Sequence, residues 1–163
     1  MPKEIEHKFL VLGPDYRGAA TRHERLQQAY LAASGKSSIR IRLGRDEAWL
    51  NIKSATLSAA RDEYDYAIPR DDGQEILERL TVGGAIDKTR FWVPYGGMVW
   101  EVDEFHGDNE GLVVAEIELE REDQTYARPP WVGRDVTQIA RYYNVKLIDR
   151  PYRLWTEAER AGE

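Results

Sequence analysis

The segment Glu4-Ile5-Glu6-His7-Lys8, near the start of the chain, carries ionisable side chains at every second position. Side chains two residues apart on a β-strand point to the same side of the sheet. Glu4, Glu6 and Lys8 would therefore share one face, with Ile5 and His7 on the other. Two interpretations follow: the charged face of an ordinary strand that borders water, or the wall of a site that holds ions.

The same alternation recurs along most of the chain and predicts a mainly β domain with antiparallel strands. Turn residues such as Gly44-Arg45-Asp46 and Tyr95-Gly96-Gly97 separate many of the alternating runs. These runs lie around residues 3–11, 38–44, 47–55, 61–68, 87–94, 98–106 and 112–121.

Three short helices are expected among and after these strands. Residues 71–80 form an amphipathic segment between two strands. A second helix would begin near the capping residue Thr137 and run through Tyr143. A third would cover residues 150–160, where Pro151 suits a first helical turn.

Composition narrows the class of protein. At 163 residues and 18.8 kDa we expect one domain, residues 1–163. The net charge of −6 argues against a general binder of nucleic acid or anionic membranes. The absence of cysteine excludes disulfides and thiolate metal sites. The first residues do not resemble a signal peptide, and no apolar run reaches the length of a membrane span. We therefore expect a soluble, cytoplasmic protein.

Most of the predicted strands carry a stripe of charge, and several stripes have one sign. The cationic pairs are Arg40/Arg42 and Lys88/Arg90, and the acidic sets are Glu101/Asp103 and Glu116/Glu118/Glu120. A solvent-exposed surface normally mixes the two signs. A half-buried antiparallel strand nevertheless usually turns its polar face to water. The alternation alone therefore leaves both interpretations open.

If the sheet closes with these stripes inward, the interior holds similar numbers of cations and carboxylates. Buried charges need partners. A polyanion together with divalent metal ions would supply them, because Arg and Lys bind phosphate oxygens and carboxylates bind Mg²⁺ or Mn²⁺.

The order of the charged motifs resembles that of the CYTH superfamily, also called triphosphate tunnel metalloenzymes. The E-x-E-x-K motif is followed by R-I-R at 40–42, L-N-I-K at 50–53, R-D-E-Y-D at 61–65, K-T-R at 88–90, W-E-V-D-E-F at 100–105 and A-E-I-E-L-E at 115–120. Residues 129–144 resemble the last conserved segment of the small bacterial members. The resemblance thus covers residues 4 to about 144, and residues 145–163 are expected to form a C-terminal helical tail.

This resemblance implies an eight-stranded antiparallel β-barrel closed around a tunnel, with a few short helices and a C-terminal helix. By similarity, the residues that bind the triphosphate are Lys8, Arg40, Arg42, Lys53, Arg61, Lys88, Arg90 and Arg141. The carboxylates that hold Mg²⁺ or Mn²⁺ are Glu4, Glu6, Asp103, Glu116 and Glu118, with Glu101 as a further candidate. The residues assigned to catalysis are Glu4, Glu6, Lys8 and Lys88.

The function implied is metal-dependent hydrolysis of phosphoanhydride bonds in inorganic tripolyphosphate or an organic triphosphate. Water would attack a terminal phosphorus, and the sequence leaves the general base unassigned. The first alternative is an adenylate cyclase of the same superfamily, because one fold can host different chemistries. The second is a polyphosphate-binding module without catalysis, which would need the cations but not the carboxylates. The partner is a small triphosphate or polyphosphate, without nucleic acid or membrane, and an apolar outer face would permit a homodimer.

A few positions invite simpler explanations. Glu101 and Glu120 could balance neighbouring cations. Tyr30 is expected to contribute packing rather than chemistry. One position departs from the family pattern: Ile139 stands where small bacterial members carry an acidic residue two positions before an Arg-Tyr pair. That departure puts in question how the segment around Arg141 is held.

Overall fold

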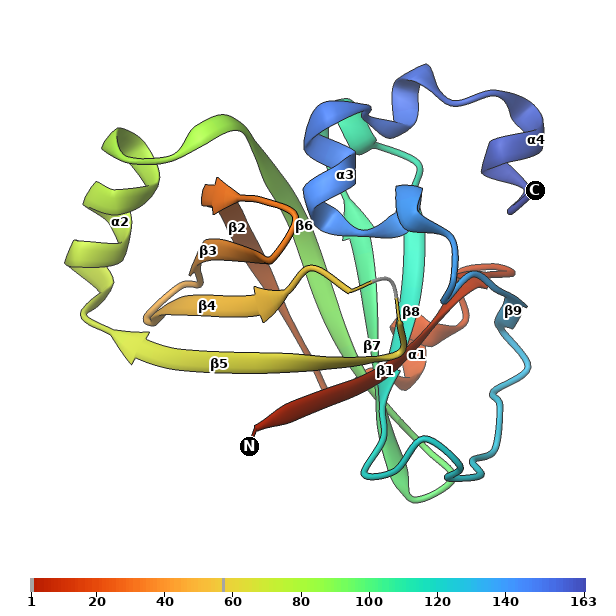
Figure 1. The fold of residues 1–163 in the computed structure, drawn as a ribbon. Helices are drawn as coiled ribbons and strands as arrows, with labels where there is room; N and C mark the ends of the chain where they lie inside the picture. Colours follow the sequence, from red (N-terminus) through yellow and green to blue (C-terminus); the bar gives the residue numbers. More distant parts are fainter. Residues whose placement is uncertain (1, 57) are drawn as a thin grey trace.

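The computed structural model describes residues 2–56 and 58–163 (Figure 1). Its strands are β1 (Lys3–Val11), β2 (Arg22–Ala33), β3 (Ser37–Leu43), β4 (Ala48–Ser54), β5 (Ala60–Ile68), β6 (Val82–Tyr95), β7 (Met98–Phe105), β8 (Val113–Glu118) and β9 (Val132–Asp135). Its α-helices are α1 (Tyr16–Ala19), α2 (Arg70–Arg79), α3 (Asn144–Asp149) and α4 (Glu157–Arg160). Short 3₁₀ turns cover Gly107–Asn109, Ala140–Tyr142 and Tyr152–Leu154. None of the helices in these two ranges is both long enough and apolar enough to cross a membrane.

The sheet closes on itself through β1. Its neighbours run in the order β5-β4-β3-β2-β6-β7-β8-β1, and β1 also pairs with β5. The first half of β1 pairs with β5, with Glu4 opposite Arg61, and its second half pairs with β8, where Glu6 faces Glu118. All of these pairings are antiparallel. The eight-stranded closed antiparallel barrel is confirmed, and β9 is an addition beside the far end of β1.

Two strands were not predicted from the sequence. The alternation in β2 is interrupted, because its pairing with β3 shifts register between Tyr30 and Ala32. As a result, three successive residues of β2, Gln28 to Tyr30, are buried. β9 is only four residues long, which is too short for a periodic signal. The expected tail helices also differ from the prediction. Residues 137–143 contain only the 3₁₀ turn Ala140–Tyr142, and α3 begins after them, at Asn144. Residues 150–160 break into a 3₁₀ turn and α4, and Thr156 forms a capping box with Glu159 at the start of α4.

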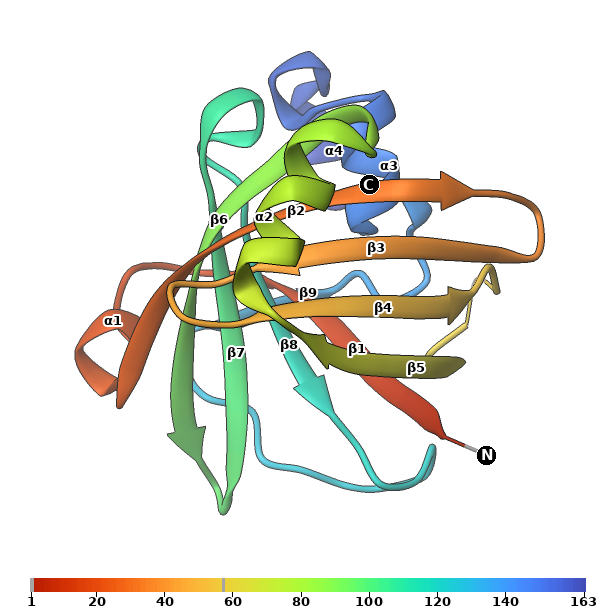
Figure 2. The same ribbon diagram turned by 90° about the vertical axis from the view of Figure 1, so that its left-hand side faces the viewer.

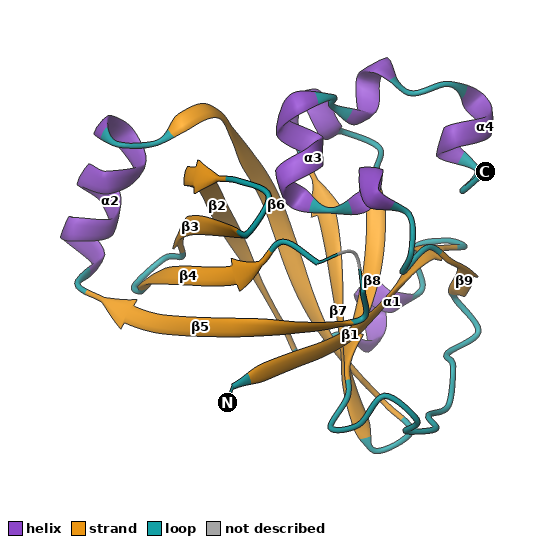
Figure 3. Ribbon diagram, in the orientation of Figure 1, coloured by secondary structure: helices purple, strands orange, loops and turns teal. Residues whose placement is uncertain are grey.

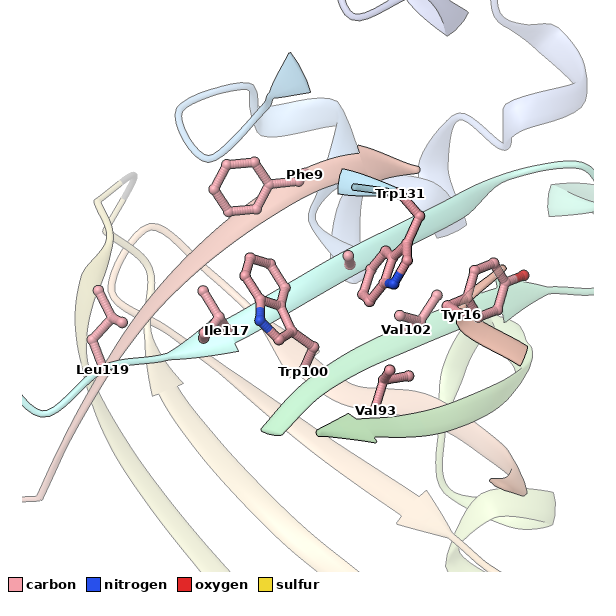
Figure 4. Packing of buried hydrophobic residues seen from close by; sticks show 9 residues of the cluster. Phe9, Tyr16, Val93, Trp100, Val102, Ile117, Leu119 and Trp131 are labelled. Atoms are coloured by element: carbon pink, nitrogen blue, oxygen red, sulfur yellow. The ribbon is translucent and has the colours of Figure 1, made fainter. Parts of the chain in front are cut away.

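The main hydrophobic core lies outside the barrel wall. Phe9, Trp100 and Ile117, from β1, β7 and β8, pack beneath Tyr16 of α1 and Trp131, which precedes β9 (Figure 4). The ring centroids of Phe9 and Trp100 are 5.6 Å apart, and those of Trp100 and Trp131 are 5.9 Å apart. Because the apolar side chains of these strands point into this outer core, the alternating polar side chains point into the barrel.

The remaining helices lie outside the barrel. α2 packs against the outer face of β3 and β4 (Figure 2). α3 and the C-terminal segment close over one end of the strands (Figure 3). There Ile86 and Phe105, from inward-facing positions of β6 and β7, form a second buried cluster with Tyr142, Leu147 and Trp155. One end of the barrel is therefore partly capped by the last twenty or so residues.

We predict that Gly73→Ala destabilises the protein. An alanine normally stabilises a helix relative to glycine by up to about 1 kcal/mol. At Gly73, however, an added Cβ would lie 2.3 Å from the Cβ of Ala48, a buried residue of β4. We expect the free energy of unfolding to fall by about 1–3 kcal/mol, the usual effect of overpacking, as measured by urea denaturation.

The matched control is Gly18→Ala in α1, where no atom lies within 4 Å of the added Cβ. Its stability should equal or slightly exceed that of the wild type. A Gly73→Ala variant as stable as the control would contradict the close packing of α2 on β4.

Candidate active site

The barrel encloses a charged cavity of about 190 Å³, here called the main cavity. Its walls come from inward-facing residues of most of the strands and from the start of α3. The predicted site residues that line it are Glu4, Glu6, Lys8, Arg40, Arg42, Lys53, Arg61, Arg90, Glu116 and Glu118. Charged side chains far apart in the sequence are thus brought to one enclosed space.

The lysines of the main cavity are buried between carboxylates. Lys8 Nζ lies 2.6 Å from Glu116 and 2.9 Å from Glu6. Lys53 Nζ lies 2.8 Å from Glu4, which Arg61 also approaches at 3.4 Å. Burial opposes the charge on Glu4, but Lys53 and Arg61 outweigh it and lower the pKa of Glu4 to about 2. Glu4 is therefore a fully ionised partner of this wall.

Two other carboxylates lie where burial and like charges disfavour their ionisation. Burial, followed by repulsion from Glu116, raises the pKa of Glu6 to about 7 despite the attraction of Lys8. Burial and repulsion from Glu4 and Glu101 also raise the pKa of Glu118. Glu6 and Glu118 face each other across the β1–β8 ladder. An additional cation between these strands would relieve the repulsion.

The carboxylates fit a hard divalent cation by their chemistry. Glu4, Glu6, Glu116 and Glu118 offer only oxygen donors, which Mg²⁺ and Mn²⁺ prefer. Within residues 2–56 and 58–163, no three Asp, Glu or His side chains converge as ligands of one ion. The contacts with Lys8 and Lys53 account for this, since they draw Glu4, Glu6 and Glu116 toward ammonium groups.

Arg40 and Arg42 differ from the other cations of the main cavity. The ion pairs of the described chain occupy Lys8, Lys53, Arg61 and Arg90, whereas Arg40 and Arg42 take part in none. The Nε atoms of both arginines are buried without a hydrogen-bond partner among these residues. Burial, followed by repulsion from Arg40 and Arg90, lowers the pKa of Arg42 to about 10. An anion in the main cavity would satisfy both groups.

Lys88 and Asp103 lie beneath the main cavity rather than on its wall. Asp103 is 1% exposed, and its two oxygens accept hydrogen bonds from Lys88 at 2.7 Å and from Arg90 at 2.8 and 2.9 Å. Burial lowers the pKa of Lys88 to about 8 even though Asp103 opposes the shift. Asp103 is therefore a counter-ion that holds Arg90 in place, and its predicted role as a metal ligand does not agree with this geometry. Lys88 likewise does not line the main cavity in this structure.

Arg141 also lies outside the main cavity, contrary to its predicted role in substrate binding. Its guanidinium donates hydrogen bonds to the carbonyl oxygens of Glu159, at 2.9 Å, and of Glu163. Nearby, Ile139 packs against the cluster of Tyr142 and Trp155. An apolar residue at position 139 is thus compatible with this chain, because the C-terminal segment supplies carbonyl partners for Arg141 and covers Ile139.

Several residues of the main cavity were not assigned from the sequence. The ring of Tyr143 lies next to two predicted site residues, 5.0 Å from the guanidinium carbon of Arg61 and 5.8 Å from Lys8 Nζ. Asn51 is buried and donates hydrogen bonds to Glu63 and Asp65. The inward parity of Asn51, Glu63 and Asp65 was visible in the sequence, whereas Tyr143 lies in the segment 129–144, where no strand periodicity marks an inward face. Tyr30, expected to contribute packing alone, is 7% exposed and also lines the main cavity.

A closed antiparallel barrel with an outer apolar core and an inner surface of charged residues defines a β-tunnel protein with a charged interior. The CYTH domain matches residues 2–152, and the chain belongs to that family. A curated relative from Acetivibrio thermocellus, named inorganic triphosphatase, is 41% identical over 96% of this chain and 100% of its own. One of the same name from Nitrosomonas europaea is 36% identical over 88% of this chain and 95% of its own.

Solved structures agree with this assignment. A crystal structure described as that of an inorganic triphosphatase superposes with a TM-score of 0.64. It is 30% identical, and the match covers 96% of this chain and 97% of that one.

We predict that Arg141→Ala weakens the fold without weakening substrate binding. The change removes hydrogen bonds from a charged group to two carbonyls, so the free energy of unfolding should fall by about 1–3 kcal/mol. The matched variant Arg40→Ala removes an unpaired arginine from the main cavity. It should instead raise KM or Kd for the anion with little loss of stability. Thermal denaturation and ligand titration of both variants distinguish the two roles, and a large rise in Kd for Arg141→Ala would restore Arg141 to the site.

Proposed function

We propose that this protein is a metal-dependent hydrolase of phosphoanhydride bonds that acts on inorganic tripolyphosphate. The observation that carries the proposal is the division of charge inside the main cavity. Within residues 2–56 and 58–163, Arg40 and Arg42 take part in no ion pair, Glu118 has none either, and Glu6 shares its one cation, Lys8, with Glu116. A polyphosphate with a divalent ion supplies both at once. The name shared by the two curated relatives supports the same activity.

The substrate would be held by exchange of partners within the wall. Arg40 and Arg42 can donate to phosphate oxygens directly, because they do not first have to leave a carboxylate. Lys8, Lys53 and Arg61 reach the same space and can transfer hydrogen bonds from carboxylate to phosphate. With the guanidinium and ammonium groups fixed by packing, little reorganisation is needed when the negative charge of the transition state develops.

Hydrolysis would then proceed by attack of a water oxygen on a terminal phosphorus. The new P–O bond forms as the bridging P–O bond breaks, and orthophosphate and pyrophosphate leave. Mg²⁺ or Mn²⁺ held by Glu4, Glu6, Glu116 and Glu118 would neutralise charge on the phosphoryl oxygens. A carboxylate on β1 or β8 would orient the water and accept its proton. The cations of β3 and β4 would hold the phosphate chain so that the attacking and leaving oxygens lie in line with the phosphorus.

The direct test offers purified protein tripolyphosphate, pyrophosphate, ATP and thiamine triphosphate, each with Mg²⁺ or Mn²⁺. We expect fastest phosphate release from tripolyphosphate, none in the presence of excess EDTA, and recovery when the ion is restored. Orthophosphate and cyclic AMP are scored separately. Formation of cyclic AMP without release of orthophosphate would identify a cyclase. Absence of orthophosphate release from all four substrates would contradict the proposed hydrolase activity.

We further predict that Glu6→Gln removes activity while the fold is kept. The amide has the same shape but no charge, so kcat should fall at least about a hundredfold as the stabilisation of several kcal/mol supplied by a bound metal is lost. The affinity for Mn²⁺, measured by calorimetry, should fall with it. The control Glu110→Gln changes an exposed carboxylate in a turn and should behave as the wild type. Full activity in Glu6→Gln would exclude this residue from the metal site.

A further inference from the structure

Gln28 of β2 is a buried polar residue that the mechanism above does not use. Its side chain is 0% exposed, and neither its Oε1 nor its Nε2 has a hydrogen-bond partner within residues 2–56 and 58–163. A buried carboxamide without partners lowers the stability of a protein, because its hydration is lost and nothing replaces it. An apolar side chain of similar size would cost less at this position. The presence of a glutamine therefore indicates a role other than stability.

Gln28 lies beside Arg42 on the inner face of the barrel. The two residues are opposite each other in the β2–β3 ladder, and Trp49 of β4 is the next residue in the same row. Residues paired in this way point to the same side of the sheet, with Cβ atoms about 4.5–5.5 Å apart. Arg42 lines the main cavity, so its side chain faces inward. Gln28 is therefore an inward-facing residue within side-chain reach of Arg42.

The unsatisfied atoms of these two neighbours are complementary. Arg42 Nε is a buried donor without an acceptor, and Gln28 Oε1 is a buried acceptor without a donor among the described residues. The guanidinium carbon of Arg42 lies 4.9 Å from the ring centroid of Trp49, its neighbour on the opposite side of the row. Rotation of the two side chains would join Nε to Oε1 without any change in the backbone.

The same barrel contains another arginine that is oriented by its opposite neighbour. Arg90 lies opposite Asp103 in the β6–β7 ladder, and Arg90 Nε donates a hydrogen bond to Asp103 at 2.8 Å. As a carboxylate, Asp103 also offsets the positive charge of the group that it orients. Gln28 can accept the Nε–H of Arg42 without a charge of its own, which leaves the positive charge of Arg42 to an anion.

The neighbours of Gln28 on β6 do not offer an equivalent donor. Ile86, directly opposite Gln28, is apolar. Lys88 lies one inward position further along β6, and its ammonium group already donates to Asp103 at 2.7 Å. Arg42 is therefore the unpartnered donor that the strand pairing places beside Gln28.

We propose that Gln28 is a positioning residue for the bound anion: its carboxamide oxygen accepts the Nε–H of Arg42 and directs the two terminal amino groups of the guanidinium toward phosphate oxygens. The proposal rests on the proposed function for the identity of the anion. A guanidinium held in this way binds one phosphate through two parallel hydrogen bonds, while Nε, on the side away from the ligand, keeps a partner. Two buried groups that lack partners in this structure are thus satisfied together.

The test is a double-mutant cycle, with the Kd for tripolyphosphate measured by calorimetry in EDTA so that turnover is prevented. Gln28→Met keeps the approximate size of the side chain but removes the acceptor. We expect Kd to rise about three- to tenfold, as for the loss of one hydrogen bond. In an Arg42→Ala background the same change should alter Kd less than about twofold. In an Arg40→Ala background it should keep its full effect, since Arg40 lies opposite Tyr30. Equal effects in the two backgrounds would overturn the proposal.

Stability distinguishes this role from a purely structural one. The urea midpoint of Gln28→Met should equal or exceed that of the wild type, because the variant removes a buried amide that has no partner. A lower midpoint together with an unchanged Kd would show that Gln28 only supports the fold. The matched control is Gln27→Met, at the next position of β2, where the side chain is exposed; both its midpoint and its Kd should be those of the wild type.

Gln28→Glu tests why the acceptor is neutral. A carboxylate opposite Arg42 would reproduce the pairing of Asp103 with Arg90 and compete with the anion, so Kd should rise further than in Gln28→Met. Binding as tight as that of the wild type would contradict the proposal. Failure of the proposed function has a different signature, because the wild type would then bind tripolyphosphate in EDTA but release no orthophosphate when Mg²⁺ or Mn²⁺ is added, whatever the result of the cycle.

Discussion

Buried charge must be neutralised, and this constraint organises the whole barrel. Lys8 is buried between Glu6 and Glu116, and Asp103 between Lys88 and Arg90. Such groups lose several kcal/mol of hydration each, which only close opposite charges recover. The arrangement is tolerable because the apolar faces of the same strands are buried elsewhere, in the outer core. The outer core thus stabilises the fold, and the interior is left to electrostatics.

Neutralisation of charge inside the tunnel is incomplete, and carboxylates and arginines are left on different walls. On the β1–β8 side, burial and repulsion from Glu116 raise the pKa of Glu6, and burial and repulsion from Glu4 raise that of Glu118, while on β3 burial and repulsion from Arg40 lower the pKa of Arg42. Interactions that are left unsatisfied in the free protein become favourable when a ligand completes them, which is how preorganised sites obtain affinity and rate. A metal ion and a polyanion correct opposite deficits, so each should bind more tightly in the presence of the other.

The sequence predicted the barrel and most of its lining because both follow from local periodicity and an ordered series of motifs. It could not assign the inward face without the family resemblance, since the decisive contacts of Phe9 and Trp100 with Trp131 join distant segments. Parity also cannot separate residues that reach the cavity from those beneath it. Asp103 lies at an inward-facing position of β7, but it is only 1% exposed because it pairs with Lys88 and Arg90 beneath the cavity. Arg141 lies beyond the strands, where periodicity gives no information.

The two ends of the tunnel are built differently, which gives the interior a polarity. At one end Tyr143 lies beside Lys8 and Arg61, and the helix that follows it is fixed by the buried cluster of Leu147 and Trp155. At the other end, a second cavity of about 170 Å³ is lined by side chains of β2, β3, β4, β6 and β7 and of the turn before β4. Glu6, whose pKa is raised, lies near the first end, and Arg22 and Arg42, each over a tryptophan ring, lie at the second together with Glu24 and Glu47. The end covered by a helix therefore holds a carboxylate that resists ionisation, whereas the end without a helix among the described residues is lined by cations and carboxylates in equal number.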